Sequence, residues 1–164
     1  MNAFALPTFP TFPPALARLN AHLPALPFSA ALAGAMNLAA WRALAGLDWA
    51  ELRGRRFCVR VSDLGLKAYF SVGRDGFAAQ VLERADVTFT ATAQDFARLA
   101  LRLEDPDTLF FNRRLIIEGD TDLGLQVKNM LDGVELEQVA AAMPAGLGRV
   151  LLRLSERALA GTSG

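Results

Sequence analysis

The sequence is short of the residues that carry most catalytic and metal chemistry. Cys58 is the only cysteine and His22 the only histidine among its 164 residues. These counts exclude a disulfide within the chain, a Cys/His metal cluster and a histidine-based catalytic triad. Gly119 and Gly124 lack the Gly-Lys-Ser/Thr ending of a phosphate-binding loop. We therefore expect no enzyme, no metal and no cofactor.

The chain also lacks an excess of charge, with 17 basic and 17 acidic residues. Nucleic-acid-binding proteins usually carry a basic excess, so no nucleic-acid partner is expected. The first positive charge, Arg18, follows four prolines, which is unlike a secretory signal. The longest uncharged stretch without proline, residues 28–41, has 14 residues, fewer than the roughly 20 needed to cross a bilayer. We expect a cytoplasmic protein that could lie peripherally on the inner membrane.

Apolar residues, in contrast, are abundant at 52% of the chain. Residues 1–27 contain six prolines, which break regular structure and predict a loop-rich arm with at most one short helix near residues 15–22. This arm also carries Phe4, Leu6, Phe9 and Phe12. Such side chains are costly to leave in water, so the arm is expected to pack on its own domain, on a partner or on lipid.

Hydrophobic periodicity predicts a helix over residues 28–44, apolar nearly all round, which suits burial between layers or contact with lipid. From Arg56 the period changes to two, and turn signals separate four predicted strands at residues 57–62, 66–72, 77–82 and 87–92. We expect these strands to form an antiparallel meander. A helix capped by Thr92 and a fifth strand at residues 114–118 follow. The fold class predicted is α+β, with a five-stranded mainly antiparallel sheet and helices packed on one face.

Two further helices are expected at the C-terminal end, over residues 135–143 and from Leu147 onward. The last has an apolar stripe and arginines at every fourth position, namely Leu147, Val150, Leu151, Leu154 and Ala158 with Arg149, Arg153 and Arg157. It either closes the core with its arginines in solvent or contacts an anionic membrane.

The segment Asp105–Asp132 is the most informative part of the chain. It combines a turn, a short strand and a helix capped by Asp120 or Thr121, with Gln126, Lys128 and Asn129 on the expected wet side. Capping explains the acids Asp120 and Asp122 better than acid–base catalysis does. The apolar residues exceed what so short a segment needs for packing, and they favour a groove for an apolar molecule; they are Leu109, Phe110, Phe111, Leu123, Val127 and Met130.

The same segment closely resembles the signature of the sterol carrier protein type two (SCP2)-like lipid-binding proteins. The resemblance rests on Asp105–Phe111, the pair Arg113-Arg114, the run Glu118–Leu125 and the following Val127-Lys-Asn. It extends from about residue 57 to about residue 138. It implies a lipid channel between the sheet and the helices and a non-catalytic role. Within the family it points to accessory factors that hold the prenyl tail of ubiquinone precursors on an oxygen-independent route, beside iron–sulfur hydroxylase partners.

We accordingly expect a proline-rich arm and apolar helix over residues 1–49, an SCP2-like domain over 50–142 and an amphipathic helix over 143–164. Arg113 and Arg114 are candidates for binding a lipid head group, or for surface ion pairs with Asp105, Asp107 or Glu118. The alternatives to a ubiquinone-precursor carrier are a phospholipid-binding, membrane-docking protein and a lipid-free scaffold for a biosynthetic complex. The residues expected to line the lipid site are Leu38, Trp41, Phe96, Leu99, Phe110, Phe111, Leu123, Val127, Met130 and Leu131.

Overall fold

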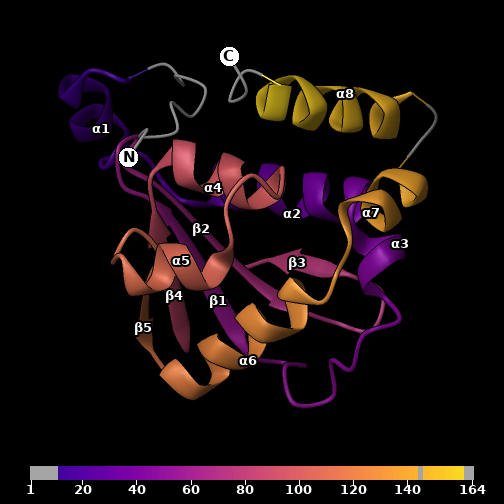
Figure 1. The fold of residues 1–164 in the computed structure, drawn as a ribbon. Helices are drawn as coiled ribbons and strands as arrows, with labels where there is room; N and C mark the ends of the chain where they lie inside the picture. The colour runs from indigo at the N-terminus through magenta and orange to yellow at the C-terminus, as the bar shows by residue number, and fades with distance from the viewer. Residues whose placement is uncertain (1–10, 144–145, 161–164) are drawn as a thin grey trace.

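The structure is a computed structural model that describes residues 11–143 and 146–160. Figure 1 shows α4, α5 and α6 in front of a twisted sheet, with α8 set apart at one end. Phe4, Leu6 and Phe9 of the expected arm lie outside the described residues. The helices are α1 (Pro14–Asn20), α2 (Leu26–Ala39), α3 (Trp41–Leu44), α4 (Ala93–Ala100), α5 (Pro106–Phe111), α6 (Thr121–Asp132), α7 (Leu136–Ala142) and α8 (Leu147–Ala160).

The strands of the described residues form one sheet in the order β3-β2-β1-β4-β5. Three of its four pairings are antiparallel, and β1 runs parallel to β4. This arrangement confirms the α+β class with a five-stranded, mainly antiparallel sheet. The strands are β1 (Arg56–Val61), β2 (Leu66–Val72), β3 (Phe77–Ala79), β4 (Val87–Ala91) and β5 (Ile116–Gly119).

The predicted meander is wrong at β4. Instead of pairing with β3, this strand crosses to the far side of β1, where Val87 lies opposite Phe57. Asp86 fixes the crossing: its carboxylate accepts hydrogen bonds from the Arg56 backbone N–H at 2.8 Å and from the Arg56 guanidinium at 3.1 Å. Strand β3 is also shorter than expected, and Val81 and Leu82 beyond it are exposed. The start of β4 is therefore tied to the start of β1.

Helix α2 is held against β2 and β3 by polar side chains. The Ser29 hydroxyl accepts a hydrogen bond from the Tyr69 backbone N–H and donates one to the Ala25 carbonyl, both at 2.8 Å. Asn37 bonds both backbone groups of Phe77, at 2.7 and 2.8 Å. The predicted single helix over residues 28–44 breaks at Ala40, whose φ is −124°. After the break, Trp41 and Trp49 pack with the Phe77 ring at centroid distances of 5.4 and 5.8 Å.

Three of the later helices begin after a residue whose side chain caps the helix by accepting a hydrogen bond from a backbone N–H. Thr92 caps α4 and Asp120 caps α6, as the sequence predicts. Asp105 caps α5, a helix of six residues where we expected only a turn. Strand β5 begins at Ile116, two residues later than predicted, so Arg113 and Arg114 lie in the turn between α5 and β5.

Helix α8 packs on α7 rather than on the sheet. Gly148 makes the close approach possible, since a Cβ atom there would lie 1.9 Å from the Ala140 carbonyl oxygen. No residue of α8 belongs to the buried clusters described among residues 11–143 and 146–160. Within those same ranges, the helices are too short or too polar to cross a bilayer.

Candidate functional site

A continuous apolar layer lies between the sheet and the helices. Its larger part, the main cluster, joins α2, α3, α6 and α7 to the sheet residues Phe57, Phe70 and Val87. Its smaller part, the α4–α5 cluster, contains Ala91, Leu109 and Leu115. Phe89 packs against both clusters and connects them. The layer therefore runs under the helices from one end of the sheet to the other.

Seven of the ten residues expected to line a lipid site lie in this layer. Leu123 and Val127 are members of the main cluster, and Trp41, Phe110 and Met130 pack against it. Phe96 and Leu99 pack against the α4–α5 cluster. The structure thus brings residues from α3, α4, α5 and α6 into one apolar interior.

The other three expected residues are exposed. Leu38 on α2 is 61% exposed, Phe111 at the end of α5 is 78% exposed, and Leu131 near the end of α6 is 37% exposed. Phe111 nevertheless contacts the layer, because its ring stacks edge-on against Phe110 with centroids 5.7 Å apart. It lies where the apolar interior meets solvent.

Arg114 is held by carboxylates from another part of the chain. Its guanidinium donates to Asp95 on α4 and to Glu104 in the loop after α4, the latter at 2.6 Å. Burial alone would lower the pKa of Arg114, but the hydrogen bonds to these two carboxylates outweigh it and hold the pKa above its usual range. The buried Arg98 joins the same group, 3.6 Å from Asp95 and 3.5 Å from Glu104. We name these four residues the arginine–carboxylate cluster.

Arg113 differs from Arg114 in its exposure and in its contacts. It is exposed and has a φ of 57°, in the left-handed region that non-glycine residues seldom adopt. Its backbone N–H bonds the Phe110 carbonyl at 3.0 Å, which closes the end of α5. Of the two candidate head-group residues, Arg113 is therefore the exposed one.

Two basic side chains tie α6 to its surroundings. The Lys128 ammonium pairs with Asp107 of α5, and only 8% of Lys128 is exposed, so its predicted place on the wet side is wrong. Arg102 donates to the Leu131 and Val134 carbonyl oxygens at the end of α6 and lies 3.6 Å from Asp132. A cation at this end also complements the helix dipole. Because each partner is distant in sequence, no local pattern indicated these contacts.

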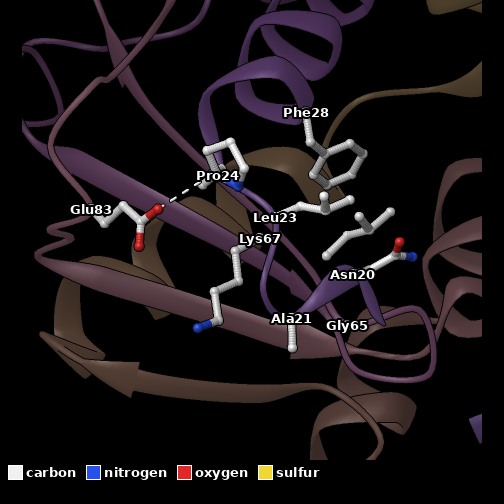
Figure 2. A pocket seen from close by; sticks show the side chains of 10 residues that line it. Asn20, Ala21, Leu23, Pro24, Phe28, Gly65, Lys67 and Glu83 are labelled. Carbon is white, nitrogen blue, oxygen red and sulfur yellow. Dashed lines mark hydrogen bonds between the residues drawn. The ribbon is translucent and has the colours of Figure 1, made fainter. Parts of the chain in front are cut away.

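A separate surface pocket lies between the α1–α2 turn and the β1–β2 turn, as Figure 2 shows. Its volume is about 320 Å³, part of it open to solvent. At its rim the Glu83 carboxylate accepts a hydrogen bond from the Ala25 backbone N–H at 3.3 Å. None of the residues expected to line a lipid site borders it.

The remaining reactive groups suggest no chemistry. Burial raises the pKa of the Cys58 thiol, against the lowering effect of a hydrogen bond with Tyr69, so the thiol stays protonated at neutral pH. In the part of the chain that the structure describes, no three His, Cys, Asp or Glu side chains gather as a metal site would require. The apolar layer thus contains no reactive group, and the charged side chains of Arg98, Arg114 and Lys128 are paired with carboxylates.

A mixed sheet of this order with helices over an apolar layer defines an α+β domain, and comparison with known proteins gives its family. Residues 42–132 match the SCP-2 sterol transfer family, which is more than half of the chain, so the chain belongs to that family. A solved structure described as the UbiJ-SCP2 ubiquinone synthesis protein shares the fold with a TM-score of 0.53. It is 19% identical, and the match covers 66% of this chain and 96% of that one.

Within the family, the chain is similar to the ubiquinone biosynthesis accessory factor UbiT of Escherichia coli K12. The two are 44% identical over 124 residues, which cover 74% of this chain and 69% of the relative. UbiT of E. coli O157:H7 matches to the same extent. The resemblance first indicated by the segment around Asp105–Asp132 is confirmed.

Proposed function

We propose that this chain is a non-catalytic lipid-binding accessory factor that holds the prenyl tail of ubiquinone precursors for oxygen-independent ubiquinone biosynthesis. The observation that carries the proposal is the continuous apolar layer, which extends from Trp41 through Phe89 to Phe96 and Leu99. Membership of the SCP-2 sterol transfer family and the similarity to UbiT support the class of cargo and the pathway.

A prenyl tail suits this layer on energetic grounds. At about 0.8 kcal/mol per buried CH₂, ten tail carbons contribute about 8 kcal/mol before the cost of ordering the tail. Ten carbons therefore set a micromolar ceiling, which the ordering cost lowers. A longer tail can be held firmly with no specific head-group contact. The cargo would enter by displacing side chains that pack on one another in its absence, and Phe111 marks the proposed entrance.

Arg113 is the proposed head-group residue. Arg113 is exposed and lies two residues after Phe111, so in this proposal its guanidinium binds a polar ring or phosphate that remains outside the layer. Arg114 has a different role in this proposal, since the arginine–carboxylate cluster holds it in place.

The partners follow from the resemblance and the nature of the cargo. The resemblance to UbiT implies that this chain acts together with hydroxylase proteins of the UbiU and UbiV type. A prenyl tail dissolves in the bilayer, so a carrier that is itself cytoplasmic has to meet the membrane to load. Peripheral association with the inner membrane is therefore part of the proposal.

Extraction of the purified protein with organic solvent, followed by mass spectrometry against a mock purification, tests the cargo. Prenylated aromatic compounds are the expected result. Phospholipid as the sole cargo would replace the ubiquinone assignment with the phospholipid-binding alternative. A lipid-free protein would contradict the carrier and favour the scaffold.

The variant F111D tests the entrance. A carboxylate there would have to lose water as the tail passes, so we expect the amount of co-purifying lipid to fall at least about five-fold, roughly 1 kcal/mol. Stability should change little, because Phe111 is 78% exposed. V81D is the matched control, since Val81 is 74% exposed and lies in the loop after β3. Normal loading of F111D would remove Phe111 from the site.

A further inference from the structure

Helix α8 has an apolar strip that no other part of the described protein covers. Gly148, which meets Ala140 of α7, and Ser155 are the buried residues of α8 and lie on one side of the helix. Leu147, Val150 and Leu154 are 49%, 52% and 49% exposed. At about 100° per residue these three side chains fall on one strip, turned away from the buried side. Packing on α7 therefore uses only part of the apolar surface of the helix.

Three arginines border the exposed strip on its other side. Arg149, Arg153 and Arg157 repeat every four residues, and all are exposed. No ion pair joins any of them to another residue of the described chain. Glu156 is the only acid on α8, so the helix carries three positive charges and one negative charge.

The positive charge of α8 decides between two occupants of the exposed strip, a second copy of this chain and an anionic bilayer. In a symmetric dimer the same patch would face itself, and two sets of unpaired arginines would repel each other. An anionic bilayer satisfies both features, because leucine and valine enter the boundary between head groups and acyl chains while guanidinium groups bind phosphates. We infer that α8 docks this protein on an anionic phospholipid surface through Leu147, Val150 and Leu154, with Arg149, Arg153 and Arg157 on the lipid phosphates.

Helix α1 and the turn after it also expose apolar side chains. Figure 1 places α1 and α8 at the same end of the molecule, beyond α4. Leu19 on α1 is 66% exposed, and Leu23 just after it is 57% exposed. The inference rests on the proposed carrier for its purpose, because a carrier loads at a bilayer, but the docking surface lies outside the apolar layer.

Co-sedimentation with vesicles of phosphatidylcholine alone and with 30% phosphatidylglycerol tests the surface. The wild-type chain should bind the anionic vesicles and release them in high salt. In R149Q/R153Q/R157Q, affinity should fall about five-fold for each arginine removed, or about 100-fold in total. R42Q/R53Q/R74Q, which removes three exposed arginines from other elements, is the control and should bind within about three-fold of wild type.

A second variant removes the apolar contact while keeping the charge. L147S/L154S should weaken binding to anionic vesicles at least about ten-fold, and V81S/L82S should not. Equal binding of the arginine variant and its control would overturn the inference, as would failure of the wild type to bind anionic vesicles. A wild-type dimer that L147S/L154S dissociates would assign the strip to a second copy instead.

Lipid extraction of the same variants separates this inference from the proposed function. In the arginine variant, loss of vesicle binding should be accompanied by less co-purifying lipid, because a carrier loads at a bilayer, whereas F111D should lower co-purifying lipid and keep vesicle binding. A lipid-free wild type that still binds anionic vesicles through α8 would contradict the carrier and leave the docking surface in place.

Discussion

Among single residues, Asp86 has the clearest consequence for stability. Hydrogen bonds from the Arg56 backbone N–H, and then from its side chain, hold the pKa of Asp86 below its usual range, against the opposing effect of burial. The unfolded carboxyl titrates near pH ~3.9. Its contribution is therefore complete above that pH and is lost as the pH falls through the lower folded pKa.

Replacing this carboxylate tests the effect. D86N should lower the free energy of unfolding by about 1–2 kcal/mol at pH 7, because a charged acceptor of two hydrogen bonds is lost. Urea titrations between pH 2 and 7 should also show a weaker dependence on pH than in the wild type. D75N, at an exposed turn position, is the control. A D86N profile parallel to the wild-type profile below pH 5 would refute the role of Asp86.

At the residue scale the sequence predicted which side chains are apolar and interior better than it predicted where charges lie. Leu123 and Val127 follow the helical period, which the local sequence contains. Lys128 falls on the polar side of that period and is nevertheless buried, because Asp107 of α5 neutralises it. Arg114 likewise pairs with Asp95 and Glu104 rather than with Asp105, Asp107 or Glu118. Such partners meet only through the tertiary fold.

At the scale of elements, the packing of α6 on the sheet depends on Gly124. A Cβ atom at this position would lie 2.3 Å from the Ile117 Cγ2 atom and 3.0 Å from the Val87 Cγ2 atom. Glycine in a helix normally costs about 1 kcal/mol relative to alanine. Here the close approach of α6 to β4 and β5 reverses that preference.

The pair G124A and G34A tests this reversal. G124A should lower the free energy of unfolding by about 1–3 kcal/mol through overpacking. G34A, on α2, should raise it by up to about 1 kcal/mol, because a Cβ atom there meets nothing within 4 Å. Thermal and urea unfolding of both variants give the comparison. A stabilised G124A would show that α6 can move away from the sheet without cost.

Most elements were predictable, and so were the antiparallel pairings of β1 with β2 and of β2 with β3. The place of β4 was not, because the turn before it does not show which strand it joins, and it pairs with β1 through the contacts of Asp86. Helix α5 shows a signal that was present and misjudged. Asp105 followed by Pro106 is a good N-cap and first-turn pair, and it begins a six-residue helix.

For the molecule as a whole, α8 is an addition to the fold rather than part of its core. A chain ending at Met143 should still unfold in one cooperative transition, because the buried clusters do not draw on α8. The loss should be about 3 kcal/mol or less, the value of the half-buried Leu151 and Leu152. Near-ultraviolet circular dichroism of Trp41 and Trp49 should be unchanged. A truncated chain that loses this signal would place α8 in the core.

The parallel pairing of β1 with β4 also sets the order in which a newly made chain can complete its sheet. The hairpin of β1 and β2 is local and can form as soon as both strands leave the ribosome. The other edge of β1 has no partner until β4 (Val87–Ala91) is synthesised. Val87, the first residue of β4, comes 26 residues after Val61, the last residue of β1. During that interval a central strand presents open backbone groups to other nascent chains. Aggregation would thus begin between nascent chains on the same messenger RNA. Slow codons between Val72 and Val87 would lengthen the time during which the edge of β1 is unpaired.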